Sequence, residues 1–361
     1  MQITDLRVEY RKNPIGLDTA KPRFSWKIES DKTDTMQTGF QIQVILDGQM
    51  IWDCGRQESD QSVLVEYGGP ALSARSVYGY RVIVWDNHGE AAEAGGSFET
   101  GLLSGTNFQA KWITHPFTQE AAAPPVFRKA ISLKKTVKWA RIYATALGVY
   151  EILIDGSKVG DAFFAPGWTN YKKRLQYQTY DVTALLNKAG PGEHILEIMV
   201  GNGWYKGIFG FTCTPNHYGD RTAVLAELHV IYDDDTNEVI VTDSDWQVKT
   251  GEVRYSEIYM GETIDTTFTE ETLQAVEAFS YPMENITAQE CEPVRIVKRT
   301  AAKELILTQK GEKVLDFGQN MAGVVEVKVQ GKPGQKIVIR HVLKTAMVFN
   351  PKLSFYYADF Y

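Results

Sequence analysis

Aromatic side chains and the polar side chains of Asn and Arg are concentrated between Asp155 and Asp220, mostly in the segments PGWTNYKKRLQYQTYD from Pro166 and GNGWYKGIFGF from Gly201. A flat aromatic ring offers an apolar face on which a sugar ring stacks. Asn and Arg side chains supply the paired hydrogen-bonding groups that distinguish hydroxyl patterns. The sequence therefore predicts a carbohydrate-binding site. Its candidate residues are Trp168, Asn170, Tyr171, Arg174, Tyr177, Asn202, Trp204 and Tyr205.

Each candidate side chain also has a purely structural explanation, and the sequence leaves both open. Trp168 and Trp204 each follow a glycine in a loop, where a ring can face a ligand or anchor the loop in the core. Asn170 and Asn202 are typical of residues that cap turns, and Arg174 is typical of a surface ion pair. The alternative to sugar binding is a set of loops that pack against another domain, because exposed apolar patches usually mark a partner surface.

The composition excludes several classes of function. A chain of 361 residues with 43% hydrophobic residues is too long for one ordinary core, so we expect two or three domains. A net charge of -7 offers no basic face to phosphates, which argues against a nucleic-acid partner. No apolar stretch approaches the roughly 18 residues of a membrane span, and the N-terminal segment shows no apolar core of a signal peptide. We therefore expect no membrane partner and a cytoplasmic location.

Metal and redox chemistry find little support in the sequence. Cys54, Cys213 and Cys291 are widely spaced and odd in number, which fits neither a disulfide framework nor a paired zinc site. The acidic run 233–235, followed by Thr and Asn, holds the oxygen ligands that calcium prefers, but a solvated hairpin tip explains it more simply. We expect no cofactor, and calcium is the one metal that stays open.

Short alternating runs separated by Gly, Asn and Asp dominate the chain, which predicts an all-β protein. Runs such as RFSWKIES, TGFQIQVIL and YGYRVIVWD predict a fibronectin III or immunoglobulin-like sandwich over residues 1–104. Residues 105–125 contain AAAPP and are predicted to form a linker.

The middle of the chain holds enough alternating segments for two packed sheets, among them WARIYATALGVYEILIDG, AVLAELHVIY and EVIVTD. A jelly-roll β-sandwich over residues 126–298 is the simplest arrangement. Residues 299–361 again show a β pattern, but they hold too few strands for a closed sandwich and would leave open edges. We predict an incomplete β segment there.

Six distinctive motifs follow one another along the chain: GVYEILIDGSKVGD, APGWTNYKKRLQYQTYDVTALL, GNGWYKGIFGF, YGDRTAVLAEL, MGETIDTT and DFGQNMAGVVEVKVQGKPGQ. Their order resembles the N-terminal portion of the bacterial α-L-rhamnosidases, glycoside hydrolase family 78. The resemblance runs over essentially the whole chain. It implies an immunoglobulin-like domain, a jelly roll related to carbohydrate-binding modules, and a β segment that leads into a catalytic α/α barrel.

The resemblance also implies a mechanism that this chain does not complete. Family members are inverting hydrolases, which use two carboxyl groups roughly 6.5 to 9.5 Å apart. Their general acid lies in the barrel, and no stretch of this sequence resembles the acidic segment that carries it. After Arg340 and His341 the sequence departs from the family pattern. We therefore assign no catalytic residue.

Two functions follow from these expectations. In the first, the chain binds L-rhamnose or a rhamnosylated glycan and positions it for an α/α barrel that this sequence lacks. In the second, the chain is a scaffold whose loops pack against that barrel and bind no sugar.

Overall fold

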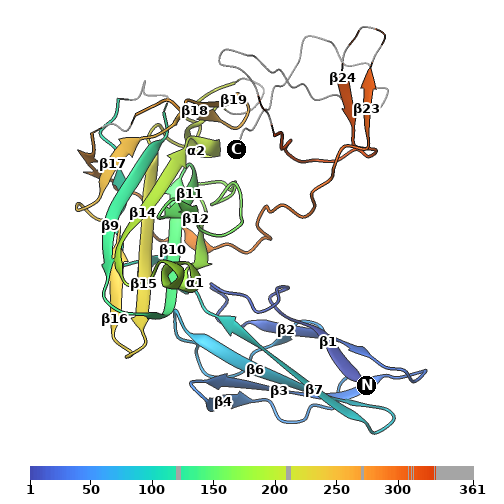
Figure 1. Cartoon of the computed structure of the whole chain (residues 1–361). Helices are drawn as coiled ribbons and strands as arrows, with labels where there is room; N and C mark the ends of the chain where they lie inside the picture. Colours follow the sequence, from blue (N-terminus) through green and yellow to red (C-terminus); the bar gives the residue numbers. More distant parts are fainter. Residues whose placement is uncertain are drawn as a thin grey trace.

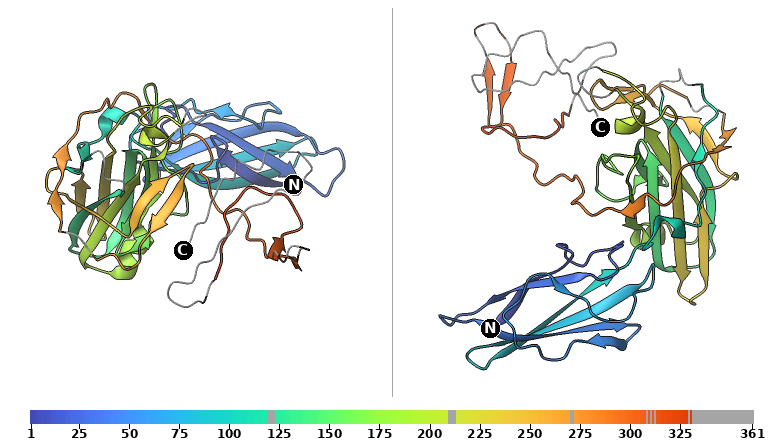
Figure 2. Two further views of the ribbon diagram at one scale, coloured as in Figure 1. Left: turned by 90° about the horizontal axis from the view of Figure 1, so that it is seen from above. Right: turned by 180° about the vertical axis from the view of Figure 1, so that it is seen from behind.

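The computed structural model describes residues 1–118, 123–208, 213–269, 272–307, 309, 311, 313–328 and 330. These residues form two β-domains, followed by an extended segment that carries a small hairpin (Figure 1). Two further views show the first domain at one end of the second, and the β23–β24 hairpin of the extended segment standing apart from both sandwiches (Figure 2).

The first domain is a sandwich of two sheets, with the strand orders β1-β2-β5 and β4-β3-β6-β7. Its strands are β1 (Gln2–Val8), β2 (Arg23–Glu29), β3 (Gln37–Leu46), β4 (Gln49–Asp53), β5 (Val65–Glu66), β6 (Val77–Asp86) and β7 (Ala91–Glu99). In β6, Tyr78, Tyr80, Val82 and Val84 are buried while the residues between them are more exposed. This alternation follows from the two-residue period of a strand, which sends successive side chains to opposite faces.

The second domain is a larger sandwich, in which one sheet runs β21-β8-β15-β10-β13-β22, with β16 also paired to β15, and the other runs β12-β11-β14-β9-β17-β20. The strands of the first of these sheets are β8 (Ile113–Thr114), β10 (Val137–Leu147), β13 (Leu175–Asp181), β15 (Ala223–Tyr232), β16 (Asn237–Val241), β21 (Glu277–Ala278) and β22 (Ile286–Ala288). Those of the second are β9 (Pro125–Leu133), β11 (Val149–Ile154), β12 (Ser157–Lys158), β14 (Gly192–Gly201), β17 (Gln247–Thr250) and β20 (Gln274–Ala275).

Short elements decorate the ends of this sandwich and the segment that follows it. They are the 3-10 turn η1 (Gly105–Asn107), the helices α1 (Thr183–Ala189) and α2 (Gly203–Lys206), the hairpin of β18 (Val253–Glu257) with β19 (Gly261–Ile264), and the hairpin of β23 (Glu304–Leu307) with β24 (Lys313–Asp316).

Strand β10 is buried on both of its faces. Ile142, Ala144 and Ala146 belong to the core between the two sheets. Tyr143 and Leu147 belong to a second buried cluster, which also contains side chains of the segment that joins the two domains. This double burial explains the nearly continuous apolar sequence of β10, which is typical of strands covered on both faces.

The all-β prediction is confirmed, together with the immunoglobulin-like first domain and the second sandwich. The segment predicted as a linker does more than connect these domains, because β8 joins the sheet of the second domain and Trp112 is buried. No helix in the part of the chain that the structure describes is long and apolar enough to cross a membrane.

Buried charged side chains join the two domains. Arg75 of the first domain donates to Glu227 on β15 at 2.6 Å, and the Glu227 side chain is fully buried. Arg141 on β10 donates to Glu99 at the end of β7 at 2.9 Å. Separating the domains would leave these carboxylates without their partners or return them to water, so the pairs tie both sandwiches into one unit.

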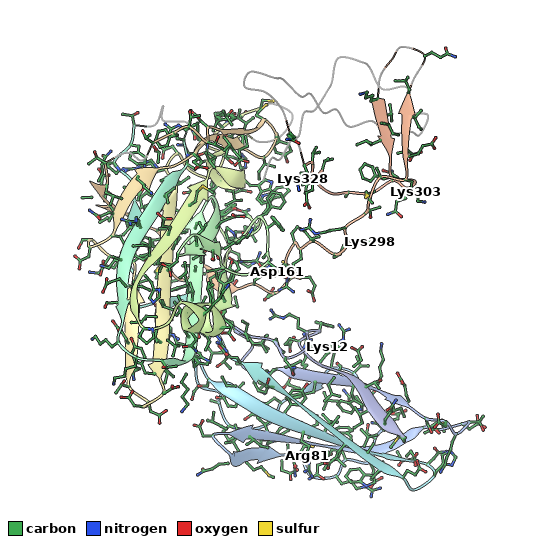
Figure 3. The ribbon with its side chains drawn as sticks, viewed as in Figure 1. Lys12, Arg81, Asp161, Lys298, Lys303 and Lys328 are labelled. Carbon is green, nitrogen blue, oxygen red and sulfur yellow. The ribbon has the colours of Figure 1, made fainter. Side chains whose placement is uncertain are left out.

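The extended segment leaves the second domain after β22. It stays attached where Arg295 pairs with Asp161 at 2.9 Å and where the backbone N–H of Phe163 donates to the carbonyl of Val294 at 2.9 Å. Figure 3 shows Asp161 on the flank of the second domain and Lys298 farther along the segment, beyond these contacts.

Candidate functional site

Trp168, in a loop, and Trp204, in the short helix α2, lie side by side in the structure. Their ring planes are 16° apart and their centroids are 6.3 Å apart. Trp168 is 54% exposed, whereas Trp204 is half-buried. The indole N–H of Trp168 donates to the hydroxyl of Tyr218 at 3.4 Å. The fold thus brings two of the predicted sugar-stacking residues to one surface.

A third ring, that of Phe164, extends this surface. Its centroid lies 5.9 Å from that of Trp204, the planes are tilted by 58°, and the side chain is 46% exposed. We call Phe164, Trp168, Trp204 and Tyr218 the aromatic platform. Sequence reasoning missed Phe164, although two successive phenylalanines in a loop were a signal, since adjacent large rings rarely fit into the same side of a core.

The spacing of the two tryptophans limits how a ligand can approach them. Carbon atoms in favourable contact lie about 3.5–4.0 Å apart, so a sugar ring held between two aromatic faces needs a separation of about 7–8 Å. The centroids of Trp168 and Trp204 are closer than this, at 6.3 Å. A sugar ring therefore cannot enter between the two tryptophans.

Two of the predicted tyrosines lie beneath the platform and are buried. The rings of Tyr171 and Tyr205 meet at 5.4 Å and 76°, and Tyr171 also packs against Tyr218 at 4.9 Å. The Tyr171 hydroxyl donates to the carbonyl of Gly167 at 3.1 Å, next to Trp168. Burial raises the pKa of Tyr205 to about 12 and also raises that of Tyr171, so both phenols stay protonated. These side chains support the platform from the core and do not face solvent.

The short helix α2, which carries Trp204, is fixed by its neighbours. Gly203 adopts φ 54°, and a Cβ there would lie 2.8 Å from the backbone nitrogen of Val149, so only glycine fits this close approach. The Asn202 amide donates to one carboxylate oxygen of Glu257 at 2.8 Å, and the other oxygen accepts the N–H of Ile208 at 3.1 Å. The amide group of Asn202, predicted to bind a sugar, therefore holds the start of the helix that carries Trp204.

Asn170 and Arg174 sit in an exposed turn. The Asn170 carbonyl accepts the backbone N–H groups of Lys173 and Arg174, at 2.8 and 2.9 Å, and its side-chain oxygen accepts that of Lys172 at 3.2 Å. Arg174 pairs with Glu290 at 3.2 Å, with both side chains more than half exposed. These contacts match the turn-capping and ion-pair alternatives, and both side chains remain open to solvent.

Tyr177 is buried at the junction with the first domain. Its hydroxyl donates to Asp18 at 2.6 Å and accepts the backbone N–H of Leu102 at 2.7 Å. The structure thus sorts the predicted residues into three places. Trp168 and Trp204 form the platform with Asn202, Tyr171 and Tyr205 as supports, Asn170 and Arg174 lie in the exposed turn, and Tyr177 belongs to the domain junction.

Models of three domain families match the chain in order. The Rha78A-like N-terminal immunoglobulin domain matches residues 3–104, the α-L-rhamnosidase N-terminal domain matches residues 135–298, and the bacterial α-L-rhamnosidase concanavalin-like domain matches residues 306–352. The chain belongs to the α-L-rhamnosidase family. It matches the N-terminal portion of that family's members, as the motif order predicted.

Relatives and solved structures of α-L-rhamnosidases agree with this assignment. An α-L-rhamnosidase of Formosa agariphila is 32% identical over 96% of this chain and 40% of the relative. The crystal structure of the Aspergillus terreus α-L-rhamnosidase is 31% identical, with a TM-score of 0.80, over 89% of this chain and 39% of that one. The Streptomyces avermitilis α-L-rhamnosidase, solved in complex with L-rhamnose, is 27% identical, with a TM-score of 0.76, over 89% of this chain and 49% of that one. This chain therefore spans less than half the length of each of these α-L-rhamnosidases.

The acidic run 233–235, considered above as a calcium site, forms the turn of the β15–β16 hairpin. Asp234 pairs with Lys135, whose hydrogen bond lowers the pKa of that carboxyl to about 2. Asp235 pairs with Lys138. Within the described ranges, no three His, Cys, Asp or Glu side chains gather in a group that would hold a metal ion. The run thus serves as an ion-paired hairpin tip.

Proposed function

We propose that the chain recognises a terminal α-L-rhamnosyl residue of a glycan or glycoside and positions it for hydrolysis by the catalytic domain of an α-L-rhamnosidase. The observation that carries the proposal is the aromatic platform, in which Trp168, 54% exposed, lies beside Trp204. Buried tyrosines hold this pair from below, so its geometry is set before a ligand arrives. A preformed apolar surface loses little ordering entropy on binding.

The chemistry of the platform suits this ligand. The apolar side of a pyranose stacks on the exposed indole, while side chains of the neighbouring turn offer hydrogen bonds to hydroxyl groups. Asn170 and Arg174 are exposed and belong to the same segment as Trp168. Family membership supports the choice of sugar, and so does the bound L-rhamnose of the Streptomyces avermitilis relative.

Isothermal titration of the 361-residue chain with methyl α-L-rhamnoside tests the proposal. We expect saturable binding that weakens at least tenfold, about 1.4 kcal/mol, in Trp168→Ala. Tyr10→Ala is the matched control, because Tyr10 is an aromatic residue of the first domain that is 58% exposed. A flat titration of the unaltered chain, or equal effects of the two substitutions, would contradict sugar binding at the platform.

A second candidate function is that of a scaffold that packs against other domains of an α-L-rhamnosidase. The observation that favours it is the exposure of large apolar side chains on the extended segment and the β23–β24 hairpin. Val297 is 97% exposed, and Ile296, Leu305 and Leu307 are at least 49% exposed. Apolar side chains gathered on a surface usually mark a place where another protein surface packs.

A binding experiment with a separately produced α-L-rhamnosidase barrel domain distinguishes the two proposed functions. A scaffold should associate with that domain through the extended segment, and Val297→Asp should weaken the association while methyl α-L-rhamnoside leaves it unchanged. An α-L-rhamnoside-binding chain should titrate with the glycoside in the absence of any barrel. Failure to associate with the barrel would rule out the scaffold function.

A further inference from the structure

Three consecutive basic residues, Lys172, Lys173 and Arg174, lie in the turn that follows Tyr171, and all three side chains are exposed. We call these three residues the cationic turn. The ring of Tyr171, which precedes them, packs against Tyr218 of the aromatic platform at 4.9 Å. Positive charge therefore gathers beside the platform, in a chain whose net charge is -7.

The backbone of the cationic turn is fixed. The Thr169 hydroxyl donates to the carbonyl of Arg174 at 2.5 Å, and the Tyr281 hydroxyl donates to the carbonyl of Tyr171 at 2.6 Å. The turn ends at Leu175, which is fully buried. These contacts hold the turn in one place relative to the platform before a ligand binds, which lowers the ordering cost of binding.

Neighbouring residues neutralise the charges of the cationic turn only weakly. Within the described ranges, the ammonium groups of Lys172 and Lys173 form neither a hydrogen bond nor an ion pair. Arg174 pairs with Glu290, but the two side chains are 52% and 76% exposed. Water screens such an exposed pair, so it contributes little to stability and its partners exchange easily. An anion that approaches the turn can therefore bind all three basic side chains.

We propose that the cationic turn binds an anionic group, a carboxylate or a sulfate ester, on the glycan whose rhamnosyl residue the platform recognises. The inference rests on the proposed function and narrows its ligands to acidic glycans. A guanidinium group binds two oxygens of a carboxylate or sulfate at once, and the flexible ammonium groups add charge without requiring one geometry. A neutral glycan gains nothing from these charges, because they stay solvated by water.

The matched ligands are two disaccharides in which α-L-rhamnose is linked to D-glucuronic acid or to D-glucose, because they differ only in whether C6 is a carboxylate or a hydroxymethyl group. In calorimetric titration at low salt, we expect the unaltered chain to bind the acidic disaccharide about fivefold more tightly. High salt should reduce this preference to below about twofold, because it screens exposed charges. A third disaccharide, with a sulfate ester at C6 of the glucose, distinguishes the two kinds of anion.

The double variant Lys172→Gln/Lys173→Gln tests the position of the charges. It should lower the preference for the acidic disaccharide to below about twofold, because the Arg174 charge alone remains. The control is Lys134→Gln/Lys188→Gln, which removes the same charge at two exposed lysines outside the turn. This control should keep the preference of the unaltered chain.

Glu290→Gln provides a test in the opposite direction. It releases Arg174 from its exposed pair and removes a negative charge beside the turn. We expect the affinity for the acidic disaccharide to rise about two- to fivefold, with the affinity for the neutral disaccharide unchanged. An ion pair that only stabilises the fold would give no such gain.

The outcomes separate this inference from the proposed function. Equal affinities for the acidic and the neutral disaccharides overturn the inference and leave the proposed function standing, because the neutral ligand still reports binding of rhamnose. A preference that survives in Lys172→Gln/Lys173→Gln also overturns the inference. A preference shown only for the sulfate ester supports it and assigns the anion. Absence of binding of all three disaccharides to the unaltered chain overturns both. Thermal unfolding of each variant checks that the fold is retained.

Discussion

The hydroxyl of Tyr177, on β13 of the second domain, donates a hydrogen bond of 2.6 Å to the carboxylate of Asp18 in the first domain. The same carboxylate accepts the backbone N–H groups of Leu103 and Ala288, at 2.8 and 2.7 Å. One side chain of the first domain thereby joins the interdomain segment, β13 and β22. Because the extended segment departs after β22, this junction also fixes the point from which it leaves.

Tyr177→Phe should destabilise the junction. The substitution leaves the partly buried Asp18 carboxylate without its side-chain donor and the N–H of Leu102 without its acceptor. Unsatisfied buried groups of this kind cost about 1–3 kcal/mol. We expect the midpoint of urea unfolding to fall accordingly. Tyr10→Phe, at an exposed position, is the control and should leave the midpoint unchanged.

The role of Tyr177 could not be read from the sequence, whereas the strands around it could. Alternating apolar residues predict which face of a strand is buried, because the side-chain period of two is a local property. The partner of a buried hydroxyl is not local, since Asp18 lies 159 residues away. Tyr177 therefore met the same aromatic criterion as Trp168, and only the tertiary fold separates the two.

The platform shows the same division between local and nonlocal information. Glycines before Trp168 and Trp204 marked loop positions, and both side chains reach the same surface. The contribution of Phe164 depends on its φ of 59°, which no hydrophobic pattern encodes. Likewise, the side-chain amide of Asn202 was predicted to bind a ligand, but it donates its hydrogen bond to Glu257, which lies 55 residues away.

Arg75→Met should cost more stability than the loss of an exposed ion pair. Glu227 is fully buried, and without Arg75 it keeps only the donors of Gln109 and His229. Breaking a buried pair by removing one partner costs about 3–5 kcal/mol, whereas exposed pairs contribute about 0–1 kcal/mol. Arg174→Met, which breaks an exposed pair, is the matched control. Equal losses in guanidinium unfolding would show that the domain junction is not held by Glu227.

His115 should make the stability of the chain depend on pH. Burial, assisted by the charges of Lys206 and Arg221, lowers the pKa of His115 to about 4 from an ordinary value of 6.5. Between these values the unfolded chain binds a proton that the folded chain does not, so stability falls as the pH is lowered through this window. The contribution lost between pH 7 and pH 5 is about 2 kcal/mol.

The corresponding measurement is the free energy of unfolding at pH 7 and at pH 5. We expect His115→Gln to lose about 2 kcal/mol less than the unaltered chain over this interval, because its side chain does not titrate. His88→Gln, at an exposed turn of the first domain, is the control and should follow the unaltered chain. An identical pH dependence in His115→Gln would mean that His115 is protonated in the folded state.

Gly203→Ala should loosen the helix that carries Trp204. Gly203 and Gly156 both have positive φ, at 54° and 75°. An added Cβ at Gly203 meets the backbone of Val149 at 2.8 Å, whereas at Gly156 nothing lies within 4 Å. Alanine in the left-handed region costs roughly 1–2 kcal/mol at either position. The difference in thermal stability between Gly203→Ala and Gly156→Ala therefore measures the cost of the steric contact with Val149. Gly203→Ala, but not Gly156→Ala, should also weaken binding of methyl α-L-rhamnoside.

Trp204→Ala should weaken binding of methyl α-L-rhamnoside more than Arg174→Ala does. Trp204 backs Trp168 and touches Phe164, so its loss removes the support of both rings at once. Central aromatic anchors carry most of the binding energy in recognition sites, whereas Arg174 already shares its charge with Glu290 in an exposed pair. We expect a loss of at least tenfold for Trp204→Ala and less than about threefold for Arg174→Ala in calorimetric titration. Trp204→Phe, which keeps an aromatic ring, should recover part of the affinity, and equal or reversed effects of the two alanine variants would show that hydrogen bonding, not ring stacking, dominates the site.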